Sequence, residues 1–189
     1  MKIYFTASIG GMYEFENNYR EIVNDLESLG HEIIARHIFN VTSQKLAKES
    51  IKEREEHYKQ LRKWLVSCDI VVIEASHPST NVGFEISMAL ERDKPVLVLH
   101  IKGRVPVLLL GLNTNKLRIV EYSLPELSHI LETNIDGLSH LSDTRFNFFI
   151  SKSIVSYLDW IARKRRLPRA VYLRQLINKE MRKYPEFRS

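Results

Sequence analysis

The feature of this sequence that most restricts its fold is the alternation of short apolar runs with longer segments in which apolar residues recur at helical spacing. Apolar runs without a polar face are typical of strands that are covered on both sides. Five runs are expected to be strands, at residues 2–7, 32–35, 70–73, 95–100 and 116–120. Helices are expected at residues 14–29, in at least the later part of 45–66, and at 83–91 and 125–132. The pattern predicts an α/β domain with an open, doubly wound parallel five-stranded sheet of the Rossmann or flavodoxin-like kind.

Charge divides the 189 residues into two parts. Residues 1–136 hold 16 Lys and Arg against 19 Asp and Glu, whereas residues 137–189 hold 12 against 4, a balance of +8. We expect the α/β domain at residues 1–135, a linker at 136–143 and a small basic module at 144–189. A basic tail either binds a polyanion such as DNA or is a solvated surface, and composition leaves both interpretations open.

Several classes of protein are disfavoured by the composition. No apolar run approaches the length of a membrane span, and the chain opens on a strand-like segment without a signal-peptide pattern, so we expect a cytoplasmic protein without a membrane segment. The single cysteine, Cys68, excludes an internal disulfide framework and a Cys-rich zinc site. No metal or organic cofactor is implied.

The loop after the first expected strand carries residues suited to small ligands. Ligands of open parallel sheets bind outside the carboxyl ends of the strands. The run Ser8, Ile9, Gly10, Gly11 offers a hydroxyl and exposed N–H groups to an anion or a sugar hydroxyl. A tight turn that requires glycine would account for the same residues.

The loop after the third expected strand, at residues 74–83, is richer in polar groups. It holds Ser79 and Asn81, and Gly83 would let the backbone approach a ligand closely. Glu85 is expected in the first turn of the following helix. A carboxylate there either stabilises the helix N-terminus or acts on the anomeric carbon of a sugar.

Motifs in four separated regions resemble the nucleoside 2-deoxyribosyltransferase superfamily. They are Ile-Tyr-Phe-Thr-Ala-Ser-Ile-Gly-Gly at 3–11, Trp-Leu at 64–65 with Cys-Asp-Ile-Val-Val at 68–72, Pro-Ser-Thr-Asn-Val-Gly-Phe-Glu at 78–85, and Lys-Pro-Val-Leu at 94–97. The third region is most similar to the 2′-deoxynucleoside 5′-phosphate N-hydrolases. The resemblance covers about residues 1–134 and implies cleavage of an N-glycosidic bond through an oxocarbenium-like state.

The resemblance also implies roles for individual residues. Glu85 matches the family's nucleophile, and Tyr4 matches the tyrosine whose hydroxyl holds that carboxylate. His37 falls where the family lines the base pocket. Matches to the loops that hold the sugar and its 5′ end are Ser8, Ile9, Gly10, Gly11, Ser79 and Asn81.

Three positions depart from the family pattern. Gly10 stands where the hydrolases carry an arginine, and Val107 stands where they use a serine of the neighbouring subunit on the phosphate. Arg104 is a candidate to supply the missing cation. Leu61 stands where the superfamily has a helical aspartate, with His57 one turn earlier, so another group must help the base to leave if this chain is active.

The basic tail has a strand-helix-helix pattern, with the strand at 145–150 and helices at 154–166 and 170–183. So short a module buries little surface alone, and must pair or dock. The order resembles a ribbon-helix-helix DNA-binding module, in which Arg145 and Asn147 would read bases. A dimerisation arm is the alternative.

Together these observations predict a homodimer that cleaves the glycosidic bond of a (deoxy)nucleoside or its 5′-monophosphate. Two alternatives stay open. One is a deoxyribosyltransferase, which delivers the sugar to a second base instead of water. The other is a nucleotide-sensing domain that controls a DNA-binding tail.

Overall fold

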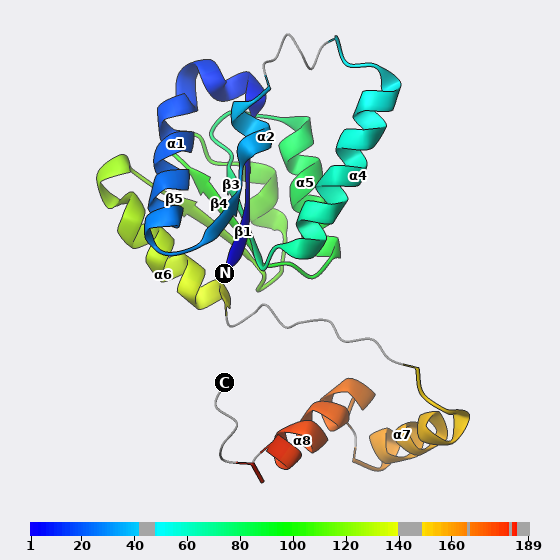
Figure 1. Cartoon of the computed structure of the whole chain (residues 1–189). Coiled ribbons are helices and arrows are strands. Elements are labelled where there is room, and N and C mark those ends of the chain that lie inside the picture. Colours follow the sequence, from blue (N-terminus) through cyan, green and yellow to red (C-terminus); the bar gives the residue numbers. More distant parts are fainter. Residues whose placement is uncertain (42–47, 140–148, 166, 182, 185–189) are drawn as a thin grey trace. The chain divides into compact units, whose positions relative to one another are not determined.

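The chain is described by a computed structural model at residues 1–41, 48–139, 149–165, 167–181 and 183–184. It consists of two compact units, unit 1 at Met1–Asp143 and unit 2 at Thr144–Ser189 (Figure 1).

Unit 1 is built on a parallel sheet. Its strands are β1 (Lys2–Ala7), β2 (Glu32–Ile34), β3 (Ile70–Glu74), β4 (Val96–His100) and β5 (Leu117–Glu121), in the spatial order β2-β1-β3-β4-β5. Every neighbouring pair is parallel. The predicted doubly wound α/β fold is confirmed.

Helices cover both faces of this sheet. Helices α1 (Met12–Ser28) and α6 (Leu127–Ser139) lie on one face, and α4 (Ile51–Ser67) and α5 (Thr80–Glu91) lie on the other (Figure 1). Side chains alternate along β1, so that Ile3 and Phe5 pack under α1 and α6, whereas Tyr4 packs under α4 and α5. Shorter elements are η1 (Ile9–Gly11), α2 (Arg36–Phe39), η2 (Val107–Gly111) and η3 (Leu124–Glu126).

The sheet order places a crevice at the carboxyl ends of β1 and β3. From β1 the chain runs outward to β2 and then returns to the other side of β1 as β3. The connections that leave β1 and β3 therefore run in opposite directions. In open α/β sheets, ligands bind in the crevice that forms at such a point, outside the carboxyl ends of the strands. The chain that follows β1 and the chain that follows β3 both carry residues singled out from the sequence.

Helix α5 begins earlier than the pattern predicts. The Ser79 hydroxyl caps the helix by accepting a hydrogen bond from the Val82 amide at 3.4 Å, so helical backbone starts at Thr80 rather than residue 83. Asn81 and Gly83 are therefore helical rather than part of a loop. Glu85 lies in the second turn of α5, not in its first turn.

Helix α6 is longer than expected and ends at Ser139. Its last turn buries Leu138 in the core, and this burial holds the helix together beyond residue 132. The first four residues of the expected linker at 136–143 are thus helical, and the rest of it lies outside the described residues.

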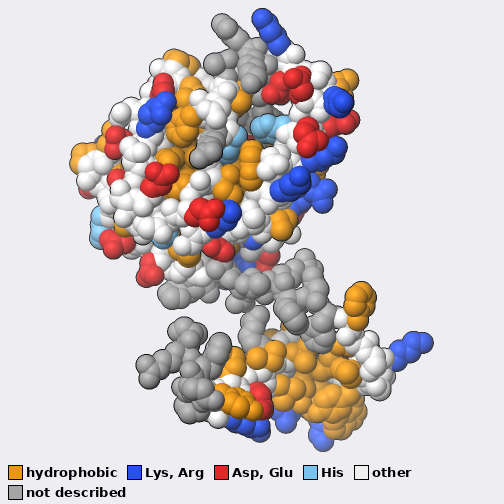
Figure 2. Space-filling view, in the orientation of Figure 1, with side chains coloured by type: hydrophobic (Ala, Val, Ile, Leu, Met, Phe, Trp, Pro, Cys, Tyr) orange, Lys and Arg blue, Asp and Glu red, His pale blue; other side chains and the backbone are white. Residues whose placement is uncertain are grey.

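Unit 2 contains α7 (Lys152–Arg165) and α8 (Arg169–Met181). Its small core holds Leu158, Ile161 and Tyr172. Figure 2 shows hydrophobic side chains over much of the visible face of unit 2; among its described residues the exposed large apolar ones are Phe149, Ile150, Ile154, Tyr157, Trp160, Val171, Leu176, Ile177, Met181 and Tyr184.

The strand expected at residues 145–150 is largely untested. Arg145 and Asn147 lie outside the described residues, and the described remainder, Phe149 and Ile150, is not part of a strand.

Candidate active site

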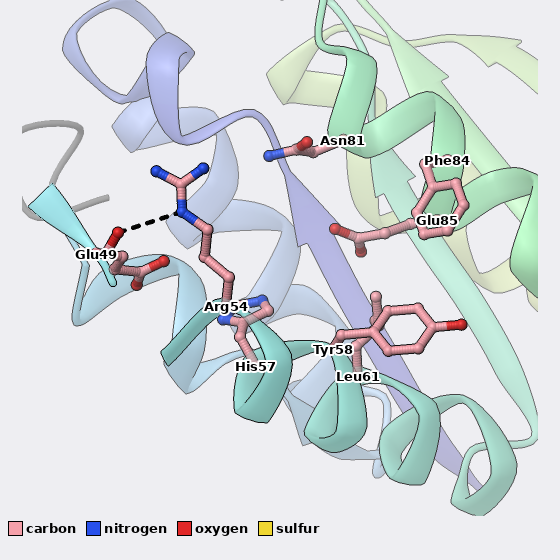
Figure 3. A pocket seen from close by; sticks show the side chains of 8 residues that line it. All are labelled: Glu49, Arg54, His57, Tyr58, Leu61, Asn81, Phe84 and Glu85. Atoms are coloured by element: carbon pink, nitrogen blue, oxygen red, sulfur yellow. Dashed lines mark hydrogen bonds between the residues drawn. The ribbon is translucent and has the colours of Figure 1, made fainter. Parts of the chain in front are cut away.

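A cavity of about 440 Å³ lies between α4 and α5 on one face of the sheet. Its size is in the range of small-ligand sites. Figure 3 shows α4 and α5 side chains facing one another across it, with the carboxylate of Glu85 directed into the gap. The lining residues are Glu49, Arg54, His57, Tyr58, Leu61, Asn81, Phe84 and Glu85.

Glu85 and Tyr4 form the polar centre of this cavity. The Tyr4 hydroxyl donates a hydrogen bond to Glu85 Oε2 at 2.8 Å. Tyr4 is fully buried, and its place on the α4/α5 face of β1 directs its phenol toward the second turn of α5. Two residues that are 81 positions apart in sequence are thereby joined at the wall of the cavity.

The pKa of the Glu85 carboxyl group lies near neutral pH. Withdrawal from water raises the pKa of Glu85 from its ordinary value to about 7, while hydrogen bonds from Tyr4 and Thr6 act in the opposite direction. A carboxyl group with such a pKa is present both as acid and as carboxylate near pH 7. Perturbed carboxyl groups of this kind, at the wall of a cavity, are typical of catalytic sites.

His37 lies against Tyr4, and not among the residues that line the cavity. Its Nε2 is 3.1 Å from the Tyr4 hydroxyl oxygen, and the two rings stack with centroids 5.1 Å apart. Burial lowers the pKa of His37 to about 3, so the imidazole is neutral at neutral pH. Because the Tyr4 proton points to Glu85, the His37 Nε2–H donates to Tyr4, and a relay runs from His37 through Tyr4 to Glu85.

Trp64 completes an aromatic layer behind the carboxylate. Its ring stacks on Tyr4 with centroids 5.9 Å apart and lies 4.7 Å from the His37 ring. Three rings in contact leave the Tyr4 phenol little freedom to rotate away from Glu85. Trp64 belongs to the motif at 64–65, but the sequence alone did not mark it as part of the site.

The loop after β1 is connected to the loop after β3. The Ser8 hydroxyl lies 3.1 Å from His77 Nδ1, and Ser8 is buried. Gly11 packs so tightly that a Cβ there would lie 2.6 Å from the Tyr19 hydroxyl and 2.7 Å from His77 Cβ. Close packing therefore explains this glycine by itself, whatever else the loop binds.

A second cavity, of about 510 Å³, lies beside the opposite face of α5. Ser79 and Gly83 line it together with His77 and Arg104. The residues predicted to bind substrate are therefore divided by α5, because Asn81 and Glu85 lie on one side and Ser79 and Gly83 on the other. Arg104 also forms an ion pair with Glu14 at 3.1 Å.

The α4 wall of the first cavity holds polar residues that the sequence analysis did not assign to the site. Arg54, His57 and Tyr58 line this wall, and only His57 was noted at all, as a neighbour of Leu61. Along α4 the residues His57, Leu61 and Trp64 recur at helical spacing, which could have identified one continuous face. Leu61 is itself buried in the core beside Tyr4.

A second buried carboxyl group, Glu74, lies at the end of β3 and lines neither cavity. Its partners are the Ser76 hydroxyl and amide and the Tyr122 hydroxyl, the last at 3.2 Å. Burial raises the pKa of Glu74 to about 7. These contacts tie β3 to the chain after β5, so Glu74 holds the ends of these strands together.

Within the described ranges no three His, Cys, Asp or Glu side chains come together in a way that could hold a metal ion. The same ranges contain no helix with the length and apolar character needed to cross a membrane.

The curated proteins with related sequences are named as N-hydrolases. A 2′-deoxynucleoside 5′-phosphate N-hydrolase 1 of Methanosarcina mazei is 34% identical over 140 residues, which are 74% of this chain and 84% of the relative. A 5-hydroxymethyl-dUMP N-hydrolase of Danio rerio is 27% identical over 143 residues, 74% of this chain and 99% of the relative. No protein-family model matches the chain.

The fold has a solved counterpart. The structure of a CMP N-glycosidase from Clostridium botulinum aligns with 71% of this chain and 99% of its own, with a TM-score of 0.53 and 20% sequence identity. At this identity the likeness concerns the α/β fold. It supports the α/β architecture of unit 1.

Proposed function

The chain belongs to the 2′-deoxynucleoside 5′-phosphate N-hydrolase family, and from this premise we propose that it hydrolyses the N-glycosidic bond of a nucleoside 5′-monophosphate. The observation that carries the proposal is the 2.8 Å hydrogen bond from Tyr4 to a carboxylate at the wall of a cavity large enough for a nucleoside. The names of the relatives favour a deoxyribose sugar.

In the proposed first step, the free oxygen of the Glu85 carboxylate approaches C1′ of the sugar. As the C1′–N bond breaks, its electron pair leaves with the base, and positive charge develops on the sugar. Tyr4 binds the other carboxylate oxygen and fixes the carboxylate's orientation. Glu85 then either forms a bond to C1′ or stabilises the cation as an ion pair.

In the proposed second step, water attacks C1′. If an ester to Glu85 has formed, its C1′–O electron pair returns to the carboxylate, and one water proton is taken up by a base in the site. The products are the free base and the sugar 5-phosphate, and Glu85 is regenerated.

The test is turnover of a panel of deoxynucleoside and ribonucleoside 5′-monophosphates by the wild type and by Glu85→Gln. We expect base release by the wild type and a loss of roughly 10³-fold or more in the variant, whose amide cannot act as the nucleophile. Glu132→Gln, a matched exchange on the exposed side of α6, should have wild-type activity. Equal activity of Glu85→Gln and wild type would refute the role of Glu85.

The same reaction separates hydrolysis from transfer. With a second free base present, a transferase produces a new nucleotide, whereas a hydrolase yields free sugar phosphate alone. Absence of any turnover across the panel would favour a nucleotide-sensing domain instead.

We propose that the 5′-phosphate is bound beside the N-terminus of α5, where Ser79 and Arg104 line the second cavity. The first turn of α5 carries no acidic residue, so the amide groups at its N-terminus can favour an anion. Arg104 would then supply the charge that Gly10 lacks. Arg104→Ala should raise KM for a monophosphate by roughly tenfold or more and leave the matching nucleoside unaffected, since a charged hydrogen bond contributes about 1.5–3 kcal/mol.

We also propose that a second copy of the chain covers η2. Leu108 is 93% exposed and Val107 is 70% exposed, beside a cavity that both residues line. Isolated exposed apolar residues are common, but a run of them next to a ligand cavity is typical of an interface. Because unit 2 is also proposed to pair, the test uses unit 1 alone, Met1–Asp143. Light scattering should give a dimer for unit 1 with the wild-type sequence and a monomer for its Leu108→Glu variant, whereas a monomeric wild-type unit would contradict the proposal.

For unit 2 we propose pairing with the same unit of a second copy and binding of duplex DNA by the pair. The balance of +8 beyond residue 136 and the exposed apolar residues of α7 and α8 favour this. Retention of a duplex should fall steeply with salt, and Arg145→Ala should reduce it. A tail that pairs without retaining DNA would be a dimerisation arm.

A further inference from the structure

The α4 wall of the first cavity lacks an acidic side chain where the family resemblance places one. Leu61 occupies that position, and it is buried in the core. A nucleobase that leaves with the electron pair of the broken bond is stabilised when a proton is delivered to one of its ring nitrogens or carbonyl oxygens. A chain that cleaves such a bond therefore needs a proton donor on the side of the cavity opposite Glu85.

Four side chains of this cavity other than Glu85 carry groups that could be considered as proton donors: Glu49, Arg54, His57 and Tyr58. A guanidinium keeps its proton in proteins, which excludes Arg54 as a donor. Figure 3 shows Glu49 at the end of the cavity away from Glu85, and the Tyr58 hydroxyl directed away from Glu85.

His37 is excluded on different grounds. Its imidazole is neutral at neutral pH, and its Nε2–H is engaged with Tyr4, at a distance of 3.1 Å from Nε2 to the phenol oxygen.

His57 remains, and its ring is held in place. It packs edge-on against Trp64 with centroids 6.4 Å apart and an interplanar angle of 88°. Trp64 in turn stacks on Tyr4, which binds Glu85. A continuous set of contacts thus fixes the imidazole on α4 relative to the carboxylate on α5, with the cavity between them.

We propose that His57 is the catalytic acid that protonates the departing base, an inference that rests on the proposed function. In the first step the imidazolium gives one proton to the base while the C1′–N electron pair leaves with it. In the second step the neutral imidazole takes one proton from the water that attacks C1′. His57 ends the cycle protonated, and the balance is one water consumed for each bond cleaved.

The test compares two leaving groups in the full-length protein. One substrate is the natural nucleotide that the wild type cleaves fastest, and the other is 2-deoxyribose 5-phosphate with a 4-nitrophenyl group at C1. Nitrophenolate is a stable anion and departs without a proton, whereas a nucleobase benefits from one. Variants are His57→Gln and, as a matched control, His129→Gln, which changes an exposed histidine on α6.

We expect His57→Gln to lower the first-turnover rate of base release from the natural nucleotide roughly 10²-fold or more and to change the first-turnover rate of nitrophenolate release by less than about threefold, because both rates measure the first step alone. Retained nitrophenolate release also shows that the variant is folded. His129→Gln should match the wild type with both substrates. An equal loss on both substrates, or no loss on the nucleotide, would overturn the role of His57 while leaving the proposed function intact. Failure of the wild type to release any base would overturn the proposed function, and the role of His57 with it.

Discussion

Removing the Tyr4 hydroxyl should move the pH dependence of the reaction rather than abolish activity at all pH values. In Tyr4→Phe the Glu85 carboxylate loses the hydrogen bond that Tyr4 donates at 2.8 Å. That hydrogen bond lowers the pKa of Glu85, whereas burial raises it to about 7 overall. With burial unchanged and the donor gone, the pKa must rise.

The size of the shift follows from the strength of such hydrogen bonds. A hydrogen bond to a charged group contributes about 1.5–3 kcal/mol, which corresponds to about one to two pKa units. The pKa of Glu85 should therefore rise from about 7 to about 8–9 in Tyr4→Phe. At pH 7 the carboxylate fraction then falls from about one half to between about one tenth and one hundredth, and kcat/KM falls roughly 5- to 50-fold.

The assay is kcat/KM for the preferred nucleotide between roughly pH 5.5 and 9.5. The acidic limb of the profile should shift to higher pH in Tyr4→Phe, and activity should recover toward the wild-type value above about pH 9. Tyr13→Phe, at an exposed position of α1, is the matched control and should keep the wild-type profile. An acidic limb with an unchanged midpoint would refute the argument that Tyr4 controls the ionisation of Glu85.

Two further predictions concern stability. Gly11→Ala should lower the unfolding free energy by about 1–3 kcal/mol, because a Cβ there would lie 2.6 Å from the Tyr19 hydroxyl; urea denaturation measures this, and Gly111→Ala, where nothing lies within 4 Å, should be near neutral. Glu85→Gln should match the wild type near pH 4.5 and exceed its unfolding free energy by on the order of 3 kcal/mol near pH 8. The carboxyl group ionises near its ordinary pKa of 4.5 in the unfolded chain and near 7 in the folded one, so the wild type loses stability as the pH rises from the first value to the second. The same difference at both pH values would contradict the second prediction.

The fold was predictable because the burial of its strands can be recognised directly in their amino-acid sequence. β3 and β4 are apolar along almost their whole length. A strand whose sheet is covered by helices on both faces has no solvent-exposed face, so its sequence does not alternate between apolar and polar residues. The start of α5 was harder to predict, since Pro78, Asn81 and Gly83 are also typical of loops. One hydrogen bond to the Ser79 hydroxyl decides between helix and loop there, and it depends on side-chain geometry rather than on pattern.

The pairing of Tyr4 with Glu85 was expected from the resemblance, but the environment that sets their chemistry was not. The pKa of Glu85 depends on how far burial withdraws its carboxyl group from water. The cavity wall that faces this group comes from α4, a helix rich in charged residues. A charged amphipathic helix usually presents its polar residues to solvent. Only the position of α4 over the carboxyl end of β1 turns part of that face into a cavity wall.

His57 and Leu61 show why comparison position by position misses such a replacement. One helical turn separates them, a rise of about 6 Å along the axis of α4. The length of the imidazole side chain and a different position of the base along α4 can together bridge this distance. A position-by-position sequence comparison shows that the carboxyl group is missing at Leu61, but it does not show which other residue could donate the proton. The cavity shows an imidazole on the same helix face, held by Trp64 and opposite Glu85. A group that delivers a proton is defined by the atom it can reach, so the position of the donor can move along α4 while the reaction that it serves stays the same.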